Sequence, residues 1–327
     1  MTFTKLTALA MTTALCATAA AAQDREGWPE SFTVATASQG GTYFAYGSGW
    51  ANLVADELGI SGGGEVSGGP GQNMALVHTG EVQFGMTTMG PAAEALEGLS
   101  PIAPGLQMTN ACAMFPMYQT PFSVTALSSS GITSIDEIPA GARIGFGPAG
   151  STSDTYFPRM METLGVDFER RNGGWTDLGG QLQDGLLDVI AFAAGVPVPA
   201  VSQLEVQTDV NIIEFTDEEQ ATILANFPVA PFDITADTYT TLTEDATSVS
   251  MWNFAIANCD LPDSFVNSVV DIIMSDNERM MNIHRAAAST IPENYDKNQV
   301  LMWHPGAAQW FIENTGADIP ADMIHGN

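Results

Sequence analysis

Basic residues are scarce in this sequence of 327 residues, which has 9 Lys and Arg against 38 Asp and Glu. The formal net charge of −29 would repel nucleic-acid backbones and anionic membrane surfaces, so we exclude both as partners. Hydrophobic residues are not depleted, since they make up 45% of the sequence. That content is enough for a folded core and argues against a disordered chain. The acidic surplus indicates a solvated surface suited to salty surroundings.

Catalytic and cofactor motifs are also missing. The glycine-rich segments have no following Lys-Ser or Lys-Thr, no Gly-x-Ser-x-Gly occurs, and only Lys5 and Lys297 are available as lysines. His78, His284, His304 and His325 are far apart in the sequence, and no Cys-x-x-Cys is present. We therefore expect no enzyme activity, no metal site and no cofactor.

Long hydrophobic runs are restricted to the N-terminus. Lys5, an apolar stretch at 6–15 and the small residues Ala20, Ala21 and Ala22 predict a secretory signal over residues 1–22. Leu15 before Cys16 does not fit a lipidation site. The sequence therefore predicts an exported, periplasmic protein without stable membrane insertion. No later stretch predicts a transmembrane helix, since the best run, 189–201, is interrupted by glycine and prolines.

Three cysteines are present, and Cys16 lies inside the predicted signal. Cys112 and Cys259 would face an oxidising compartment, where thiols can pair. They are 147 positions apart, and the sequence alone does not give the distance between them. A disulfide and two free thiols both remain open at this point.

Glycine, in contrast, is abundant and recurs in a repeated unit. A β-prone segment at 31–37 runs into a Gly-rich turn and then a helical stripe that ends at Gly59. The same order returns at 143–165, with the loop 147–153 and an end at Gly165. A second unit of helix, glycine and strand also occurs twice, at 72–86 and 180–192.

Alternating strands and helices in two copies predict an α/β protein of two lobes. Segments 121–127 and 249–257 are extended and β-prone, so we expect them to carry the chain between the lobes. The predicted boundaries are lobe I at 23–123 plus 250–327 and lobe II at 124–249. Helices at 263–275 and 305–314 are expected to return to lobe I.

The two uncharged loops, 38–43 and 147–153, stand where a strand hands over to a helix. Ligands collect at this edge of an open α/β sheet, and unpaired N–H groups at a helix start favour an anion. Ser151 with Asp154 also fits a helix cap, so capping and ligand contact both stay open for this serine.

Five ordered motifs resemble the TAXI receptors, the solute-binding proteins of one class of tripartite ATP-independent periplasmic (TRAP) transporters. They are Gly-Gly-Thr-Tyr at 40–43, the glycines and Asn73 within 68–80, the Gly-rich loop at 147–152, the stretch 185–197, and His-Pro-Gly-Ala at 304–307. The resemblance covers nearly the whole chain after residue 22. It implies a type II periplasmic-binding fold, with two lobes on a two-strand hinge and a ligand cleft between them.

The resemblance also implies the ligand-binding residues, which come from both lobes: Gly41, Thr42, Tyr43, Asn73, Thr87, Ser151, Thr152, Ser153, Gly195 and Val196. The implied ligand is a small acid, glutamate-like or a C4–C5 dicarboxylate such as 2-oxoglutarate. The sequence departs from the family pattern at Phe44 and at Gln72-Asn73, which bears on ligand identity. His304 is expected to support the returning helix rather than contact the solute.

We therefore expect a receptor that closes on a small carboxylate and delivers it to TRAP membrane subunits. The alternative with the same fold is a periplasmic sensor that signals to a membrane kinase. A secreted hydrolase would need an activated nucleophile, and the sequence contains no motif for one.

Overall fold

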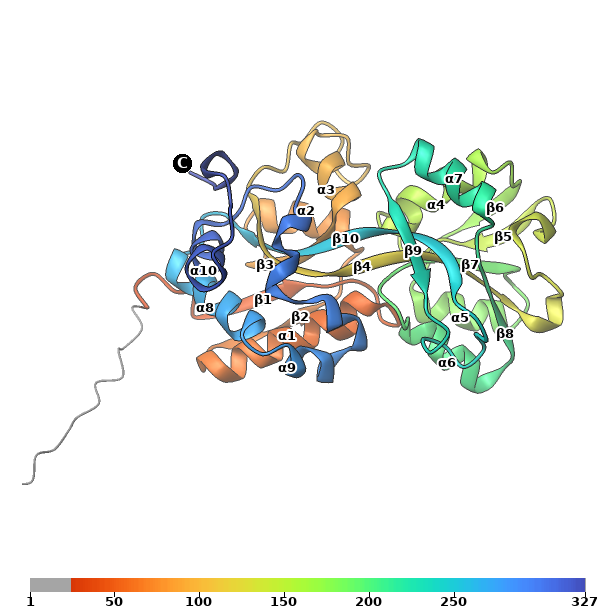
Figure 1. Ribbon diagram of the computed structural model, residues 1–327, viewed down its shortest axis with the longest axis horizontal. Helices are drawn as coiled ribbons and strands as arrows, with labels where there is room; N and C mark the ends of the chain where they lie inside the picture. Colours follow the sequence, from red (N-terminus) through yellow and green to blue (C-terminus); the bar gives the residue numbers. More distant parts are fainter. Residues whose placement is uncertain (1–24, 327) are drawn as a thin grey trace, which may run out of the picture.

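A computed structural model describes residues 25–326, and it has two α/β lobes joined by two long strands (Figure 1). Strands β4 (Ala111–Leu127) and β10 (Ala246–Asn258) pair antiparallel and run through both lobes. The two crossover segments expected from the sequence are thus parts of longer shared strands. The predicted signal at 1–22 lies outside the described residues.

Lobe I is built on one side of this strand pair. Its sheet has the order β2-β1-β3-β10-β4, and β1 pairs in parallel with both β2 and β3. Its other elements are β1 (Ser31–Ala35), β2 (Ser61–Glu65), β3 (Phe84–Thr88), α1 (Thr42–Leu58), α2 (Pro70–His78), α3 (Met89–Leu96), α8 (Asp263–Met274), α9 (Asn277–Ile283), η3 (Arg285–Ser289), η4 (Pro292–Lys297), α10 (Pro305–Thr315) and η5 (Ala321–Met323).

Lobe II is built on the other end of the same pair. Here β4 continues to β7, β5 and β6, with β8 also on β4 and β9 on β10. The elements are η1 (Ser128–Ser130), η2 (Ile135–Glu137), β5 (Ala142–Gly145), α4 (Thr152–Thr163), β6 (Phe168–Arg171), α5 (Trp175–Gln183), β7 (Val189–Ala193), α6 (Pro199–Gln207), β8 (Val210–Ile213), α7 (Asp217–Asn226) and β9 (Ala230–Ile234). As in lobe I, helices cover both faces of a mixed sheet.

The repeated helices form and end as the sequence predicts. Helix α1 buries Trp50, Val54 and Leu58 on one face, and it ends at Gly59 with φ 64°, a left-handed conformation that favours glycine. Helix α4 ends at Thr163, two residues before Gly165, which has φ 79°. A left-handed glycine follows the helix in both copies, and this shared signal explains why the two units could be recognised from sequence.

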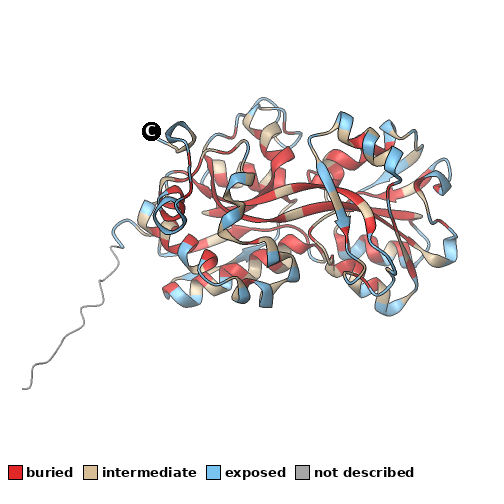
Figure 2. Ribbon diagram, in the orientation of Figure 1, coloured by how far each residue is buried: buried red, intermediate tan, exposed pale blue. Residues whose placement is uncertain are grey.

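Each lobe has its own hydrophobic core, and buried residues also run continuously along the shared strands (Figure 2). In lobe I the rings of Phe32, Trp50, Phe84 and Phe265 pack edge to face or tilted against one another. Lobe II contains two clusters, one including Phe157 and the other including Trp175. Because the cores are separate, the shared strands are the natural place for the lobes to move against each other.

Cys112 and Cys259 form a disulfide, with 5.3 Å between their Cα atoms. Cys112 lies near the start of β4 and Cys259 follows the end of β10, so the bond closes the outer end of the shared strand pair. This resolves the pairing that the sequence left open. None of the described helices is both long and apolar enough to cross a membrane.

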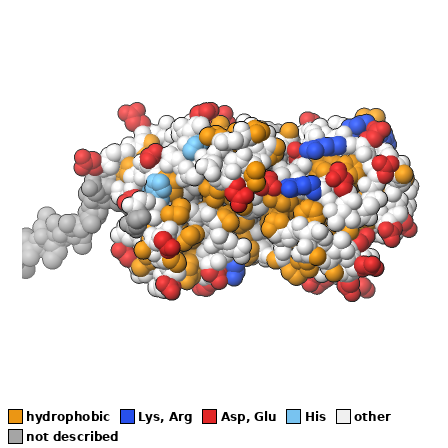
Figure 3. All heavy atoms as spheres, turned by 90° about the horizontal axis from the view of Figure 1, so that it is seen from above, with side chains coloured by type: hydrophobic (Ala, Val, Ile, Leu, Met, Phe, Trp, Pro, Cys, Tyr) orange, Lys and Arg blue, Asp and Glu red, His pale blue; other side chains and the backbone are white. Residues whose placement is uncertain are grey.

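The surface carries many acids and few bases, and the face seen in Figure 3 has Asp and Glu scattered over both lobes. Several arginines form ion pairs: Arg143 with Asp188, Arg159 with Glu94, and Arg285 with Asp237. Most of the acidic surplus therefore has no matching cation within the protein.

Candidate functional site

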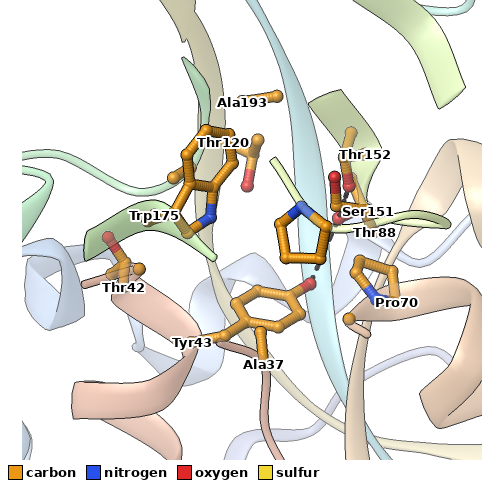
Figure 4. A pocket seen from close by; sticks show the side chains of 14 residues that line it. Ala37, Thr42, Tyr43, Pro70, Thr88, Thr120, Ser151, Thr152, Trp175 and Ala193 are labelled. Carbon is orange, nitrogen blue, oxygen red and sulfur yellow. Dashed lines mark hydrogen bonds between the residues drawn. The ribbon is translucent and has the colours of Figure 1, made fainter. Parts of the chain in front are cut away.

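A small cavity of about 30 Å³ lies between the lobes. A cavity of this size holds one or two water molecules. Its lining comes from both lobes and from the shared strand β4: Ala37, Gly41, Thr42, Tyr43, Gly69, Pro70, Thr88, Thr120, Pro148, Ser151, Thr152, Trp175, Ala193 and Ala194 (Figure 4). An organic acid therefore enters only when the lobes part from the arrangement seen here.

Hydrogen bonds and an ion pair cross the cleft and hold the lobes together. Ala200 N donates to Gly40 O at 3.0 Å, and Arg159 pairs with Glu94 at 2.8 Å. The Thr42 hydroxyl donates to the carbonyl of Gly195. The structure thus shows the lobes closed on each other.

The cavity is surrounded by helix starts. Its lining residues include the N-cap or first turn of α1, α2, α3, α4 and α5. Each start directs the positive end of its helix dipole toward the same space, while the number of N–H groups left unpaired differs from one start to the next. No Asp, Glu, Lys, Arg or His is among the described residues that line the cavity. The site therefore favours an anion without using a charged side chain.

The start of α1 leaves its N–H groups available. Gly41 is the N-cap, none of the described side chains caps this end, and the first turn contains no acid. Glycine is required here because a Cβ on Gly41 would lie 2.8 Å from Cδ1 of Trp175. The backbone N–H groups of Thr42 and Tyr43, at the first two helical positions, are thus placed to donate to a bound anion.

The start of α4 is largely satisfied by its own side chains. The Ser151 hydroxyl accepts from Asp154 N at 3.1 Å, so Ser151 caps the helix and also lines the cavity. The Asp154 carboxylate accepts from Gly150 N at 2.9 Å and pairs with Arg170 and Asn172. The loop 147–153 therefore has fewer donors to offer than its counterpart in lobe I.

A buried hydroxyl network forms the polar wall. The side-chain oxygen Oδ1 of Asn253 on β10 accepts hydrogen bonds from three hydroxyls: Tyr43 at 2.7 Å, Thr88 at 2.8 Å and Thr120 at 3.1 Å. The hydroxyls of Thr88 in lobe I and Thr152 in lobe II form a hydrogen bond of 2.8 Å between the lobes. An amide oxygen has two lone pairs, and the third hydroxyl proton has an acceptor within the network, because Thr88 also lies within bonding distance of Thr152 and Tyr43. Burial raises the pKa of Tyr43 well above its ordinary value, which keeps this hydroxyl a neutral donor.

Trp175 forms the opposite wall (Figure 4). Its indole stacks on Phe192 with 4.5 Å between the ring centres and is only 4% exposed. A Cβ on Gly147 would lie 2.4 Å from this ring, so the glycine loops of both lobes are shaped around one indole. The indole nitrogen Nε1 faces the cavity in Figure 4, while the backbone N–H of Trp175 donates to Ser38 Oγ at 3.4 Å.

Half of the sequence-predicted ligand residues come together in this cavity. Gly41, Thr42, Tyr43, Ser151 and Thr152 all line it. The Thr42 hydroxyl is directed at Gly195 O rather than at the cavity, so its backbone N–H is the group available to a ligand. These residues remain proposed ligand contacts.

Asn73, Thr87 and Ser153 do not line the cavity, and each is fully buried. The Asn73 amide donates to Thr36 O and Met86 O, both at 2.8 Å, and so ties β1 to β3. Ser153 Oγ accepts from Ala193 N at 2.5 Å. These side chains hold the framework instead of contacting the cavity.

Gly195 and Val196 also lie just outside it. Gly195 carries the carbonyl that accepts from Thr42, and a Cβ there would lie 2.3 Å from the Tyr118 ring. Val196 precedes a cis proline and lines a separate hollow between the lobes. The cavity is lined instead by Ala193 and Ala194, which precede them.

Sequence reasoning missed several lining residues, among them Thr88, Thr120 and Trp175. Thr88 differs from the predicted Thr87 by one position at the end of β3, where successive side chains point to opposite faces. Trp175 follows Gly173 and Gly174 at the start of α5, and this third glycine loop before a helix was the available signal.

Two histidines and one possible ligand cluster lie away from the cavity. His304 caps α10 through Nδ1 and reaches Leu261 O through Nε2 at 3.1 Å, so it supports the returning helix as expected. Cys112, Cys259 and His325 lie close enough to share a metal ion, but the disulfide occupies both sulfurs.

The comparisons with known proteins agree with this architecture. The profile of the NMT1-like family matches residues 34–314, while no curated protein gives a significant match. Among solved structures, the periplasmic binding protein BugD is 15% identical with a TM-score of 0.58, covering 88% of this chain and 99% of its own. MatC from Rhodopseudomonas palustris with bound malate is 13% identical with a TM-score of 0.58, covering 86% and 95%. R. palustris Rpa4515 with adipate is 16% identical with a TM-score of 0.54, covering 83% and 97%.

Proposed function

We propose, from the premise that this chain belongs to the NMT1-like family and has the two-lobed fold of periplasmic solute-binding proteins, that it is an exported receptor for a small organic acid. The receptor closes its lobes on the acid and delivers it to a membrane transporter. The proposal includes no covalent chemistry.

One observation carries this proposal: helix starts from both lobes converge on a cavity without charged side chains. The free donors are the first two N–H groups of α1 and Nε1 of Trp175, and the hydroxyls of the Asn253 network lie beside them. A net hydrogen bond to a charged group contributes about 1.5–3 kcal/mol. Three such bonds give about 4.5–9 kcal/mol before the free-energy cost of association. Burial of the apolar part of the ligand must therefore supply the rest of the roughly 8 kcal/mol of a micromolar complex.

The finer assignment rests on the sequence motifs. They resemble TAXI receptors, so the proposed partners are the membrane subunits of a TRAP transporter. The starting set of ligands is glutamate, 2-oxoglutarate and C4 dicarboxylates, as the resemblance implies. Malate and adipate join this set, because proteins of similar fold were solved with them.

Isothermal titration calorimetry tests the proposal with small mono- and dicarboxylic acids and glutamate, beside a diamine and a neutral sugar of similar size. We expect saturable binding at one site per chain for at least one acid and no binding of the diamine. Binding of the diamine or the sugar alone would overturn it.

A further inference from the structure

The cleft also restricts what the rest of the ligand can be. We propose that the ligand carries a single carboxylate on an otherwise uncharged, largely apolar body. This inference rests on the proposed function, because it narrows the class of acid that the same cleft receives. It departs from the glutamate-like and dicarboxylate acids that the sequence resemblance implies.

The polar groups of the cavity are sufficient for one carboxylate. Figure 4 shows the hydroxyls of Thr88, Ser151 and Thr152 gathered on one side, with the indole of Trp175 across from them. Trp175 is 4% exposed, and its Nε1 faces the space between. Because Ser151 caps α4 and donates to Phe146 O, the groups that face one anion are Nε1 of Trp175 and the first N–H groups of α1, beside the Thr88–Thr152 hydroxyl pair.

The remaining lining is apolar. It includes Ala37, Pro70, Pro148, Ala193 and Ala194, beside the face of the Trp175 ring. The one further hydroxyl, that of Thr120, is bonded to the Asn253 amide. A second ionised carboxylate would be buried against these side chains without donors of its own, which strongly disfavours binding. A methyl or methylene group at the same place removes apolar surface from water and strengthens binding.

An ammonium group fits the cavity no better. None of the described lining residues is acidic, and the surrounding helix starts present positive dipole ends that repel a cation. Asp154 is near in the chain, but its carboxylate is taken by Gly150 N, Arg170 and Asn172. A zwitterionic amino acid would therefore leave its ammonium unpaired.

Matched pairs of acids test this inference by calorimetry on the purified protein. The pairs are pentanoate with glutarate, 2-oxopentanoate with 2-oxoglutarate, and norvaline with pentanoate. We expect pentanoate and 2-oxopentanoate to bind at least tenfold more tightly than their dicarboxylate partners, and norvaline to bind at least tenfold more weakly than pentanoate. Equal or tighter binding of glutarate, 2-oxoglutarate or norvaline overturns the inference and leaves the proposed receptor function intact. Binding of none of these acids, nor of any other small acid, overturns the proposed function itself.

Variants of Trp175 test the apolar wall separately. From acetate to pentanoate we expect the wild-type affinity to rise about fourfold per methylene, the equivalent of ~0.8 kcal/mol. Trp175→Ala should flatten this rise, whereas Trp175→Phe should retain it while weakening every acid through the loss of Nε1. Trp310→Phe on α10, which is similarly buried and remote from the cavity, is the matched control. It should change neither the rise per methylene nor the overall affinity.

A rise that persists in Trp175→Ala, with its fold checked by thermal melting, contradicts the assigned wall. Because Trp175→Phe keeps the ring, it tests the Nε1 contact even if Trp175→Ala does not fold.

Discussion

Helix α1 of lobe I and helix α4 of lobe II both begin after a strand and a glycine loop, and both face the same cavity. They differ in how their first N–H groups are satisfied. Gly41 caps nothing, whereas Ser151 and Asp154 bond to the backbone of their own loop. The same local fold therefore has different roles in the two lobes. In lobe I it leaves N–H donors free for a ligand, whereas in lobe II its N–H groups are bonded to side chains of the same segment.

The lobes differ in stabilisation as well. The disulfide lies in lobe I, as do all four histidines, while lobe II has neither. Both lobes contain ion pairs, such as Arg279 with Glu57 in lobe I and Arg143 with Asp188 in lobe II. Lobe I is therefore expected to respond to reduction and mild acid, and lobe II is not.

The largest expected effect is on stability, from removing the disulfide. Cys112→Ala with Cys259→Ala opens a loop of 147 residues that contains lobe II, and should lower the free energy of unfolding by about 2–5 kcal/mol. Guanidinium unfolding measures this, with reduced wild-type protein as the control. Unchanged stability in the double variant would show that the bond does not restrict the unfolded chain.

An acid at the start of α1 should have the next largest effect, on affinity. Thr42→Asp places a negative charge at the uncapped helix start and should weaken binding of an organic acid at least a hundredfold, about 2.7 kcal/mol. Asn52→Asp adds the same charge at an exposed position of the same helix and should change affinity little. Calorimetry compares the two. Equal effects would mean that net charge, and not the helix start, controls binding.

Mild acid should destabilise the protein through lobe I. The pKa of His304 is lowered to about 4, chiefly because burial disfavours the charged imidazolium; the bond to the Leu261 carbonyl offsets part of this effect. The unfolded chain takes up this proton near pH 6.5, so the contribution is complete above that pH and is lost as pH falls toward 4, by about 3 kcal/mol. Urea unfolding across this range measures it, and His304→Gln should flatten the profile.

Acid should also lower the stability of lobe II, but only at a lower pH, where Asp188 takes up a proton. The side chain of Arg143 lowers the pKa of Asp188, so its contribution is present above the ordinary carboxylate pKa and is lost below it. A full loss between pH 6.5 and 4 that persists in His304→Gln would place the sensitive group elsewhere.

The smallest expected effect distinguishes capping from ligand contact. Ser151→Ala should lower the free energy of unfolding by about 1 kcal/mol, because the cap of α4 is lost, and should leave acid affinity nearly unchanged. Thermal melting and calorimetry on the same variant separate these quantities. A tenfold loss of affinity at unchanged stability would assign Ser151 to the ligand instead.

The fold was largely predictable because its signals are local. Apolar spacing and the terminal glycines Gly59 and Gly165 defined the helices in both copies, and β-prone segments marked the shared strands. The disulfide was not predictable, since it depends on the distance between residues 147 positions apart.

The site was predictable in its loops and not in its side chains. Gly41 and Thr152 are found at the cavity because a helix start fixes where the backbone lies. Thr88 rather than Thr87 lines it, because the register at the end of a strand decides which side chain faces the cleft. Asn73 instead joins two strands, a role that depends on tertiary contacts with Thr36 and Met86.

Mass spectrometry of the solute released from protein isolated without added ligand tests the central account most directly. The account predicts a small organic anion in near-stoichiometric amount, released on unfolding and absent from the Thr42→Asp variant. A stoichiometric cation or neutral sugar would contradict it, because uncharged donors at helix starts give no reason to retain either.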